Sequence, residues 1–278
     1  MLLFENLKDK GRFTMSTFLK HRFAISNIGL SFLLSFAIGT QCTVFAQPSL
    51  PKNTSNTATT VPFIGCRSDG QVGPLEAPKG GNKVVKISAK AAQQLAYYQA
   101  EEGLGVLTPR GWYCFETYGS SGNSLFVSPQ PINATTLFSD NWKGFTGPVI
   151  QISAEDGETS GRFEVARMIA RVFPSHKAVV RRVIAEGIEP ASDFPSGPYP
   201  KDRLIYKSNE SVEYETPALT NGLGTQSRLQ KNADPIRGVA VLTGQEPSLL
   251  FLAVRLPSEI ADLTSPIIQQ MEYDDAQP

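Results

Sequence analysis

The chain has 278 residues with 26 basic and 26 acidic side chains, so its formal net charge at pH 7 is zero. This balance gives no reason to expect a nucleic acid or an anionic membrane as a partner. A chain of this length buries ~70% or more of its unfolded surface, so it can form one sizeable core without the help of a metal.

Residues 1–46 have the pattern of a secretory signal peptide. Lys20 and Arg22 precede an uncharged, largely apolar run that ends at Ala46. A basic start, an apolar centre and small residues at the end are the three parts of such a signal, so we expect cleavage near Ala46 and a periplasmic or secreted chain. Translation starts at Met1 or at Met15. The alternative is a retained membrane anchor, since the run is long enough to span a bilayer.

The rest of the chain divides into a linker and one domain. Removal of residues 1–46 takes away five basic and two acidic side chains and leaves a net charge of about −3. Residues 47–61 are rich in Pro, Ser, Thr and Asn, a composition typical of a flexible linker. Residues 62–278 are predicted to form a single globular domain, and no stretch within them is apolar enough to span a membrane.

Two cysteines remain after cleavage, Cys66 and Cys114. In an oxidising compartment an isolated pair of this kind predicts a disulfide. The alternative is a reactive thiol, but the sequence contains no CxxC motif.

The first half of the domain is predicted to be mostly strands. Residues 84–87 form a short strand and 89–102 a helix, followed by two strand segments within 105–115 that are separated by Pro109 and Gly111. A turn at 119–123 then leads into a returning strand at 124–128, and 148–153 form a further strand.

The second half contains two adjacent helices and then two hairpins. Apolar residues recur with helical spacing over 163–173 and again after Ser175. Strands are expected at 204–206 and 212–214, at 239–242 and 249–256, and a last helix starts at Ser258. Short connections favour antiparallel pairing, so the predicted fold is α+β: an antiparallel sheet with helices packed mainly on one face, and one disulfide.

Recognisable catalytic and cofactor motifs are missing. His176 is the single histidine after residue 46, which excludes a metal site made of histidines, and no GxSxG or phosphate-binding loop occurs. We therefore expect no metal and no cofactor, and we assign no catalytic residue. Glu213 and Glu215 share one face of a predicted strand and could act as acid and base, but a solvated strand has the same pattern.

Basic residues gather on the two adjacent helices. The cluster comprises Arg162, Arg167, Arg171, Lys177, Arg181 and Arg182. Arginine binds carboxylates and phosphates through two parallel hydrogen bonds, so Arg167, Arg171, Arg181 and Arg182 are candidate binding residues. The alternative is a solvated helix face whose arginines pair with the nearby acids Glu186, Glu189 and Asp193.

Trp112 is a further candidate binding residue. It follows Pro109 and Gly111, where the chain bends, and precedes Cys114. An exposed tryptophan there would offer a platform for a ligand, whereas packing around the disulfide explains the same residues as core.

Three segments resemble known secreted proteins. The segments are GCRSDGQVGP at 65–74, PRGWYCF at 109–115 with GSSG at 119–122, and GIEPASDFP with GPYPKD at 187–202. They are similar to an uncharacterised family of secreted or periplasmic proteins of Gram-negative bacteria, and the bent strand with its hairpin is similar to PsbP-like α+β domains. The resemblance implies a bacterial envelope location and no particular activity.

Two functions follow as hypotheses. The first is a non-catalytic periplasmic binding or accessory protein that engages an anionic envelope component, or a protein partner, through the basic helical pair. The second is a periplasmic hydrolase that uses carboxylates or an unrecognised serine. Invariant exposed acids in a cleft among homologues would favour the hydrolase.

Overall fold

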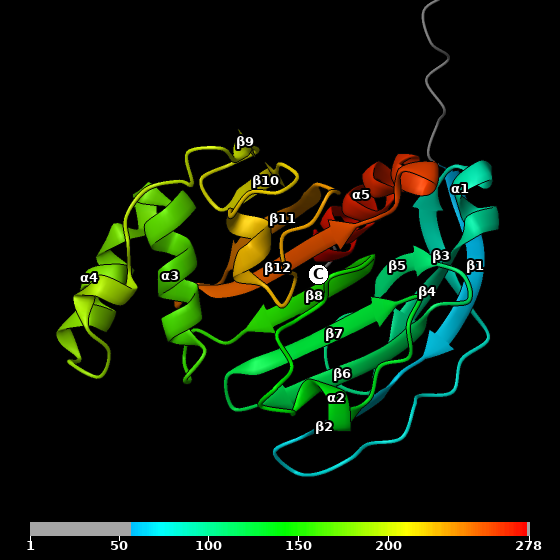
Figure 1. Ribbon diagram of the computed structural model, residues 1–278, viewed down its shortest axis with the longest axis horizontal. Coiled ribbons are helices and arrows are strands. Elements are labelled where there is room, and N and C mark those ends of the chain that lie inside the picture. Colours follow the sequence, from blue (N-terminus) through cyan, green and yellow to red (C-terminus); the bar gives the residue numbers. More distant parts are fainter. Residues whose placement is uncertain (1–56, 277–278) are drawn as a thin grey trace, which may run out of the picture. The chain divides into compact units, whose positions relative to one another are not determined.

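The computed structural model describes residues 57–276, which contain five α-helices and twelve strands in two sheets (Figure 1). The larger sheet has the order β2 (Arg67–Gly70), β6 (Tyr113–Gly119), β7 (Gly122–Ser128), β8 (Val149–Glu155), β12 (Ser248–Arg255), β11 (Ile236–Thr243), β10 (Ser211–Thr216) and β9 (Arg203–Tyr206). The smaller sheet has the order β3 (Asn82–Ile87), β1 (Thr57–Gly65), β4 (Leu95–Gln99) and β5 (Val106–Pro109). The helices are α1 (Ala89–Gln94), α2 (Ala134–Leu137), α3 (Arg162–Val172), α4 (Lys177–Ala185) and α5 (Thr264–Asp275).

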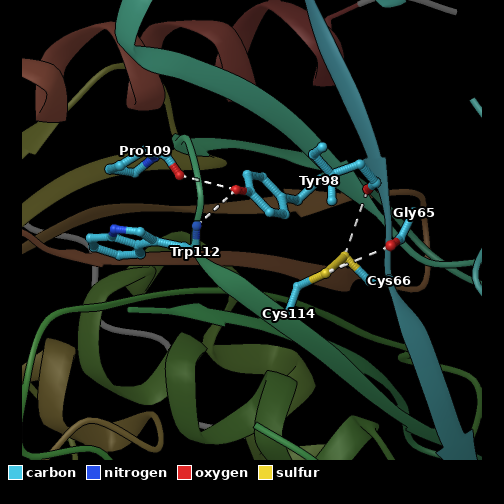
Figure 2. Close-up of a disulfide and its surroundings, with 7 residues drawn as sticks. Gly65, Cys66, Tyr98, Pro109, Trp112 and Cys114 are labelled. Carbon is cyan, nitrogen blue, oxygen red and sulfur yellow. Dashed lines mark hydrogen bonds between the residues drawn. A yellow bond between two sulfur atoms is a disulfide. The ribbon is translucent and has the colours of Figure 1, made fainter. Parts of the chain in front are cut away.

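The predicted α+β class and the disulfide are confirmed. Strand pairs are antiparallel except β1 with β4 and β2 with β6, which are parallel. The sulfur atoms of Cys66 and Cys114 lie 2.06 Å apart (Figure 2). Cys66 is the residue between β1 of the smaller sheet and β2 of the larger one, so the disulfide holds this crossing of the chain against β6.

Helices cover both faces of the larger sheet, whereas we expected them mainly on one. On β12, Leu250 and Leu252 share a core with α5 and the smaller sheet, while Leu249 and Phe251 share the opposite core with α3 and α4. The reason is the uninterrupted apolar run of this strand, which leaves no polar face for water.

Two segments differ from the predicted elements because distant strands pair with them. β1 begins at Thr57, so residues 57–61 belong to the sheet and not to the linker, while residues 1–56, with the expected signal peptide, lie outside the described residues. The helix expected over 89–102 ends at Gln94, and the chain continues as β4. Leu95–Tyr98 are buried all round between β1 and β5, which suits a central strand better than an amphipathic helix.

Candidate functional site

A cleft of about 570 Å³ lies on the face of the larger sheet that carries α3. Its floor is formed by alternate residues of neighbouring strands, which point to the same side of a sheet. These floor residues are Thr117 of β6, Ser124 and Phe126 of β7, Gln151, Ser153 and Glu155 of β8, and Leu249 and Phe251 of β12. We refer to this hollow as the sheet–helix cleft.

α3 and two loops form the walls of the sheet–helix cleft. α3 contributes Glu164, Arg167, Met168 and Arg171, and the loops contribute residues of 193–195 and 223–228. The side chain of Asp202 holds the second loop, because its carboxylate accepts hydrogen bonds from the Leu223 amide (2.7 Å) and from the hydroxyl of Thr216 (2.8 Å). This loop is thereby tied to the end of β10.

A chain of hydrogen bonds crosses the middle of the floor. The Ser124 and Ser153 hydroxyl oxygens lie 2.8 Å apart, and the Gln151 Nε2 group donates to Ser153 Oγ over 2.8 Å. The Gln151 Oε1 atom accepts from the Arg228 amide over 3.0 Å, which links the floor to the wall. These groups are fixed in place and present hydrogen-bonding atoms to the cleft.

Glu155 is the acidic group of the floor. It is half-buried, and no donor within residues 57–276 forms a hydrogen bond with its carboxylate. Burial, and to a smaller extent the negative charge of Glu164 on α3, raise the pKa of Glu155 to about 7. Both the protonated and the ionised form of this carboxyl group are therefore populated near neutral pH.

Two arginines of the cleft lack an acidic partner among the described residues. The Arg171 guanidinium donates to the carbonyl oxygen of Gly197 (3.2 Å) and lies 4.2 Å from the ring centroid of Tyr199. The Arg228 guanidinium lies 5.9 Å from the ring centroid of Trp142. Both retain free N–H donors, so this part of the cleft can accept an anionic group.

Arg167, by contrast, is neutralised. It forms ion pairs with Glu164 and with Glu189, and its guanidinium lies 5.6 Å from the ring centroid of Phe194. Asp193, which precedes Phe194 in the chain, is exposed and also lines the cleft. The charge of Arg167 is therefore compensated by acids of this chain and is not available to a ligand.

The predicted binding residues are not brought together. Arg167 and Arg171 line the sheet–helix cleft, but Arg181 and Arg182 lie exposed on α4, outside its lining. Trp112 lies near the disulfide, where it packs partly buried against the core, and its amide donates to the Tyr98 hydroxyl over 3.2 Å (Figure 2).

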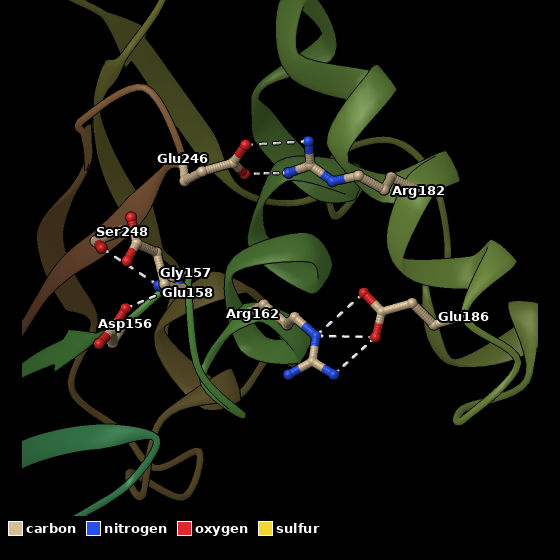
Figure 3. Close-up of polar contacts among 8 residues, drawn as sticks. All are labelled: Asp156, Gly157, Glu158, Arg162, Arg182, Glu186, Glu246 and Ser248. Carbon is tan, nitrogen blue, oxygen red and sulfur yellow. Dashed lines mark hydrogen bonds and ion pairs between the residues drawn. The ribbon is translucent and has the colours of Figure 1, made fainter.

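Much of the basic cluster is paired, as the alternative interpretation stated. Arg162 binds Glu186 with both Nε and Nη2, and Arg182 binds Glu246 in the turn between β11 and β12 (Figure 3). The second pair ties α4 to the sheet. Lys177 and Arg181 are the two cluster members that have no partner among the described residues. Glu213 and Glu215 are likewise paired, with Lys207 and with the arginines Arg203 and Arg237.

The residues of the floor were not predicted from the sequence. A signal was present in β8, where the polar residues Gln151, Ser153 and Glu155 alternate with Ile150, Ile152 and Ala154. Alternation in a strand places the polar residues on one face. The sequence does not show that a helix covers that face and encloses it.

Arg255 anchors the loop that carries Arg228, and its replacement gives a stability prediction. Arg255 is fully buried, and its guanidinium donates to the carbonyl oxygens of Gly147, Phe145 and Gln230, which clamps the loop that carries Arg228. Arg255→Met leaves the Gly147 and Gln230 carbonyls without a donor, so we expect a loss of about 3 kcal/mol in the free energy of unfolding, measured by urea titration. Arg237→Met, at an exposed ion pair, is the control, and equal losses would contradict the prediction.

The described residues contain no group of three or more His, Cys, Asp or Glu side chains that could hold a metal ion. Over residues 57–276, no helix is both long and apolar enough to cross a membrane. Comparison with known proteins finds no matching family model, no matching curated protein and no matching solved structure.

Proposed function

We propose that this protein is an exported, non-catalytic binding protein whose sheet–helix cleft takes a small ligand with an anionic group. The observation that carries the proposal is the pair of cleft arginines, Arg171 and Arg228, that have no acidic partner within residues 57–276. They stand beside a floor of fixed hydroxyl and amide groups that can hydrogen-bond the rest of the ligand. The bacterial envelope, and membership of the secreted family that the sequence resembles, are part of the same proposal.

We place the site in the cleft and not on the outer face of the helix pair. A surface that binds an anionic envelope component needs unpaired positive charge. Arg162, Arg167 and Arg182 are occupied by acids of this chain, so α3 and α4 offer little of it outside the cleft. A weak attraction through Lys177 and Arg181 is all that remains on α4.

The test is calorimetric titration of the purified protein with a panel of small anions: monocarboxylates, dicarboxylates, inorganic phosphate and sugar phosphates. We expect at least one member to bind, and Arg228→Gln to weaken it about tenfold or more, because a hydrogen bond to a charged group is lost. Arg181→Gln removes the same charge outside the cleft and is the control. No binding by any member, or equal weakening by the two variants, would overturn the proposal.

Export is tested separately. Fractionation of cells that express the full chain is expected to place the protein in the periplasm or the medium, with an N-terminus at residue 47. An uncleaved chain in the membrane fraction would show that the apolar run is an anchor.

A hydrolase is the second candidate, and Glu155 is the observation that favours it. A carboxyl group whose pKa is about 7 is suited to general acid–base catalysis, and Glu164 provides a second carboxylate nearby. Turnover of a glycan, peptide or ester that disappears in Glu155→Gln and persists in Glu158→Gln would replace the binding proposal with this one.

A further inference from the structure

The sheet–helix cleft is electrically polarised along its length. Glu164 and Arg171 are seven residues apart on α3, which separates them by about 10 Å along the helix axis. Glu155 and Gln151 are four residues apart on β8, or about 13 Å along the strand. Glu155 and Glu164 act on each other at one end, and Arg228 is bonded through its amide to Gln151, away from that end.

Between the two ends, the charge of Arg167 is already compensated, because Arg167 is paired with Glu164 and Glu189. Exposed Asp193 adds a carboxylate to the lining from the 193–195 loop. The charged groups that the sheet floor, α3 and the 223–228 loop leave without an oppositely charged partner are the Glu155 carboxyl at the acidic end and the Arg171 and Arg228 guanidinium groups at the basic end.

From this polarity we infer that the ligand is a short peptide with free termini, whose ammonium group binds Glu155 and whose carboxylate binds Arg171 and Arg228. The inference rests on the proposed function and names its ligand class. An extended chain spans at most ~3.3–3.6 Å per residue, so about three residues reach from one end to the other. The hydroxyls of Ser124 and Ser153 lie between, where the peptide groups of the ligand need hydrogen-bond partners.

Binding of an ammonium group would make the affinity depend on pH. Glu155 must be ionised to hold it, and the charged group that faces Glu155 from α3 is Glu164, while Gly122 of β7 and Leu249 of β12 carry no charge. Affinity therefore rises as pH increases from 6 to 7.5. It falls again above pH 8, because a terminal amino group loses its proton with a pKa of about 8.

Calorimetry with trialanine, N-acetyl-trialanine and trialanine amide tests the inference. We expect trialanine to bind, and each blocked peptide to bind about tenfold more weakly or worse. In Glu155→Gln the penalty for acetylation disappears, whereas the penalty for amidation remains. In Arg228→Gln the penalty for amidation disappears, whereas the penalty for acetylation remains. Glu158→Gln, an exposed acid in the turn after β8 that does not line the cleft, keeps both penalties.

The failure of this inference and that of the proposed function give different results. If N-acetyl-trialanine binds as tightly as trialanine, or if trialanine does not bind while a simple dicarboxylate does, the peptide inference is overturned and anion binding stands. If neither the peptides nor the anion panel bind, both are overturned.

Discussion

Replacing Glu116 with glutamine is expected to make the free energy of unfolding fall less steeply between pH 4.5 and pH 8 than it does in the wild type. Glu116 lies on β6 beside Ser68 of β2, is 0% exposed, and neither of its carboxylate oxygens has a hydrogen-bond partner. Burial, and to a smaller extent the charge of Glu102, raise the pKa of Glu116 from 4.5 to about 8.

The sign follows from proton binding in the two states. Between these pH values the folded protein holds the Glu116 proton and the unfolded chain has released it, so folding takes up a proton and stability falls as pH rises. One proton changes the free energy of unfolding by about 1.4 kcal/mol per pH unit, or up to about 5 kcal/mol over the whole interval. Glutamine carries no proton to release, so Glu116→Gln lacks this contribution.

Urea unfolding at pH 5, 6.5 and 8 measures the effect as the difference between the wild type and Glu116→Gln. Other carboxyl groups with a raised pKa, such as Glu155, contribute equally to the pH dependence of both proteins, so their contributions cancel in the difference. Glu101→Gln removes a charge from the exposed loop near Glu102 and is the control. Parallel pH profiles for the wild type and Glu116→Gln would show that Glu116 is not a buried neutral acid.

Removal of the Cys66–Cys114 disulfide is expected to lower the free energy of unfolding by about 4 kcal/mol. The two cysteines are 48 residues apart, so the bond restricts a long loop in the unfolded chain. In the folded protein the bond holds the crossing between the two sheets, and its loss also frees the short parallel pair of β2 and β6.

The measurement is urea unfolding of the wild type with and without a reductant, beside the double variant Cys66→Ala/Cys114→Ala. The reduced wild type and the double variant are expected to be equally destabilised, and the reductant should not change the double variant. A loss below about 1 kcal/mol would mean that the unfolded chain gains little freedom when the bond is absent.

Patterns in short stretches of sequence correctly predicted the helices and hairpins that form through contacts between neighbouring residues. The strands β6 and β7 are joined by a two-residue turn, and β11 and β12 by a short one, so each pair forms within one stretch of sequence. The apolar repeat of α3 was equally readable. β4 was not, because residues 95–99 lie in the middle of a sheet only when β1, about 30 residues earlier in the chain, pairs on the side opposite β5.

The candidate site likewise combines residues that could be predicted from the sequence with pairings that depend on contacts between distant segments. Arg171 was identified because arginines cluster in the sequence, but its free donors depend on Gly197 and Tyr199, which a loop brings to it. Arg182 belongs to the same cluster, yet Glu246 of a distant hairpin occupies it. The sequence shows how many charged residues a segment contains, whereas the fold determines which of them form ion pairs.

The α+β class, the hairpins, the helix pair and the cysteine pair were predictable from the sequence, since each depends on periodicity or on residue type over short distances. Long-range contacts place helices on both faces of the larger sheet, bury Glu116, half-bury Glu155 and form a polarised cleft between β8 and α3. These features arise from contacts between segments far apart in the chain. Burial and pairing set the charge and the pKa of a side chain, and neither is visible in the residues beside it.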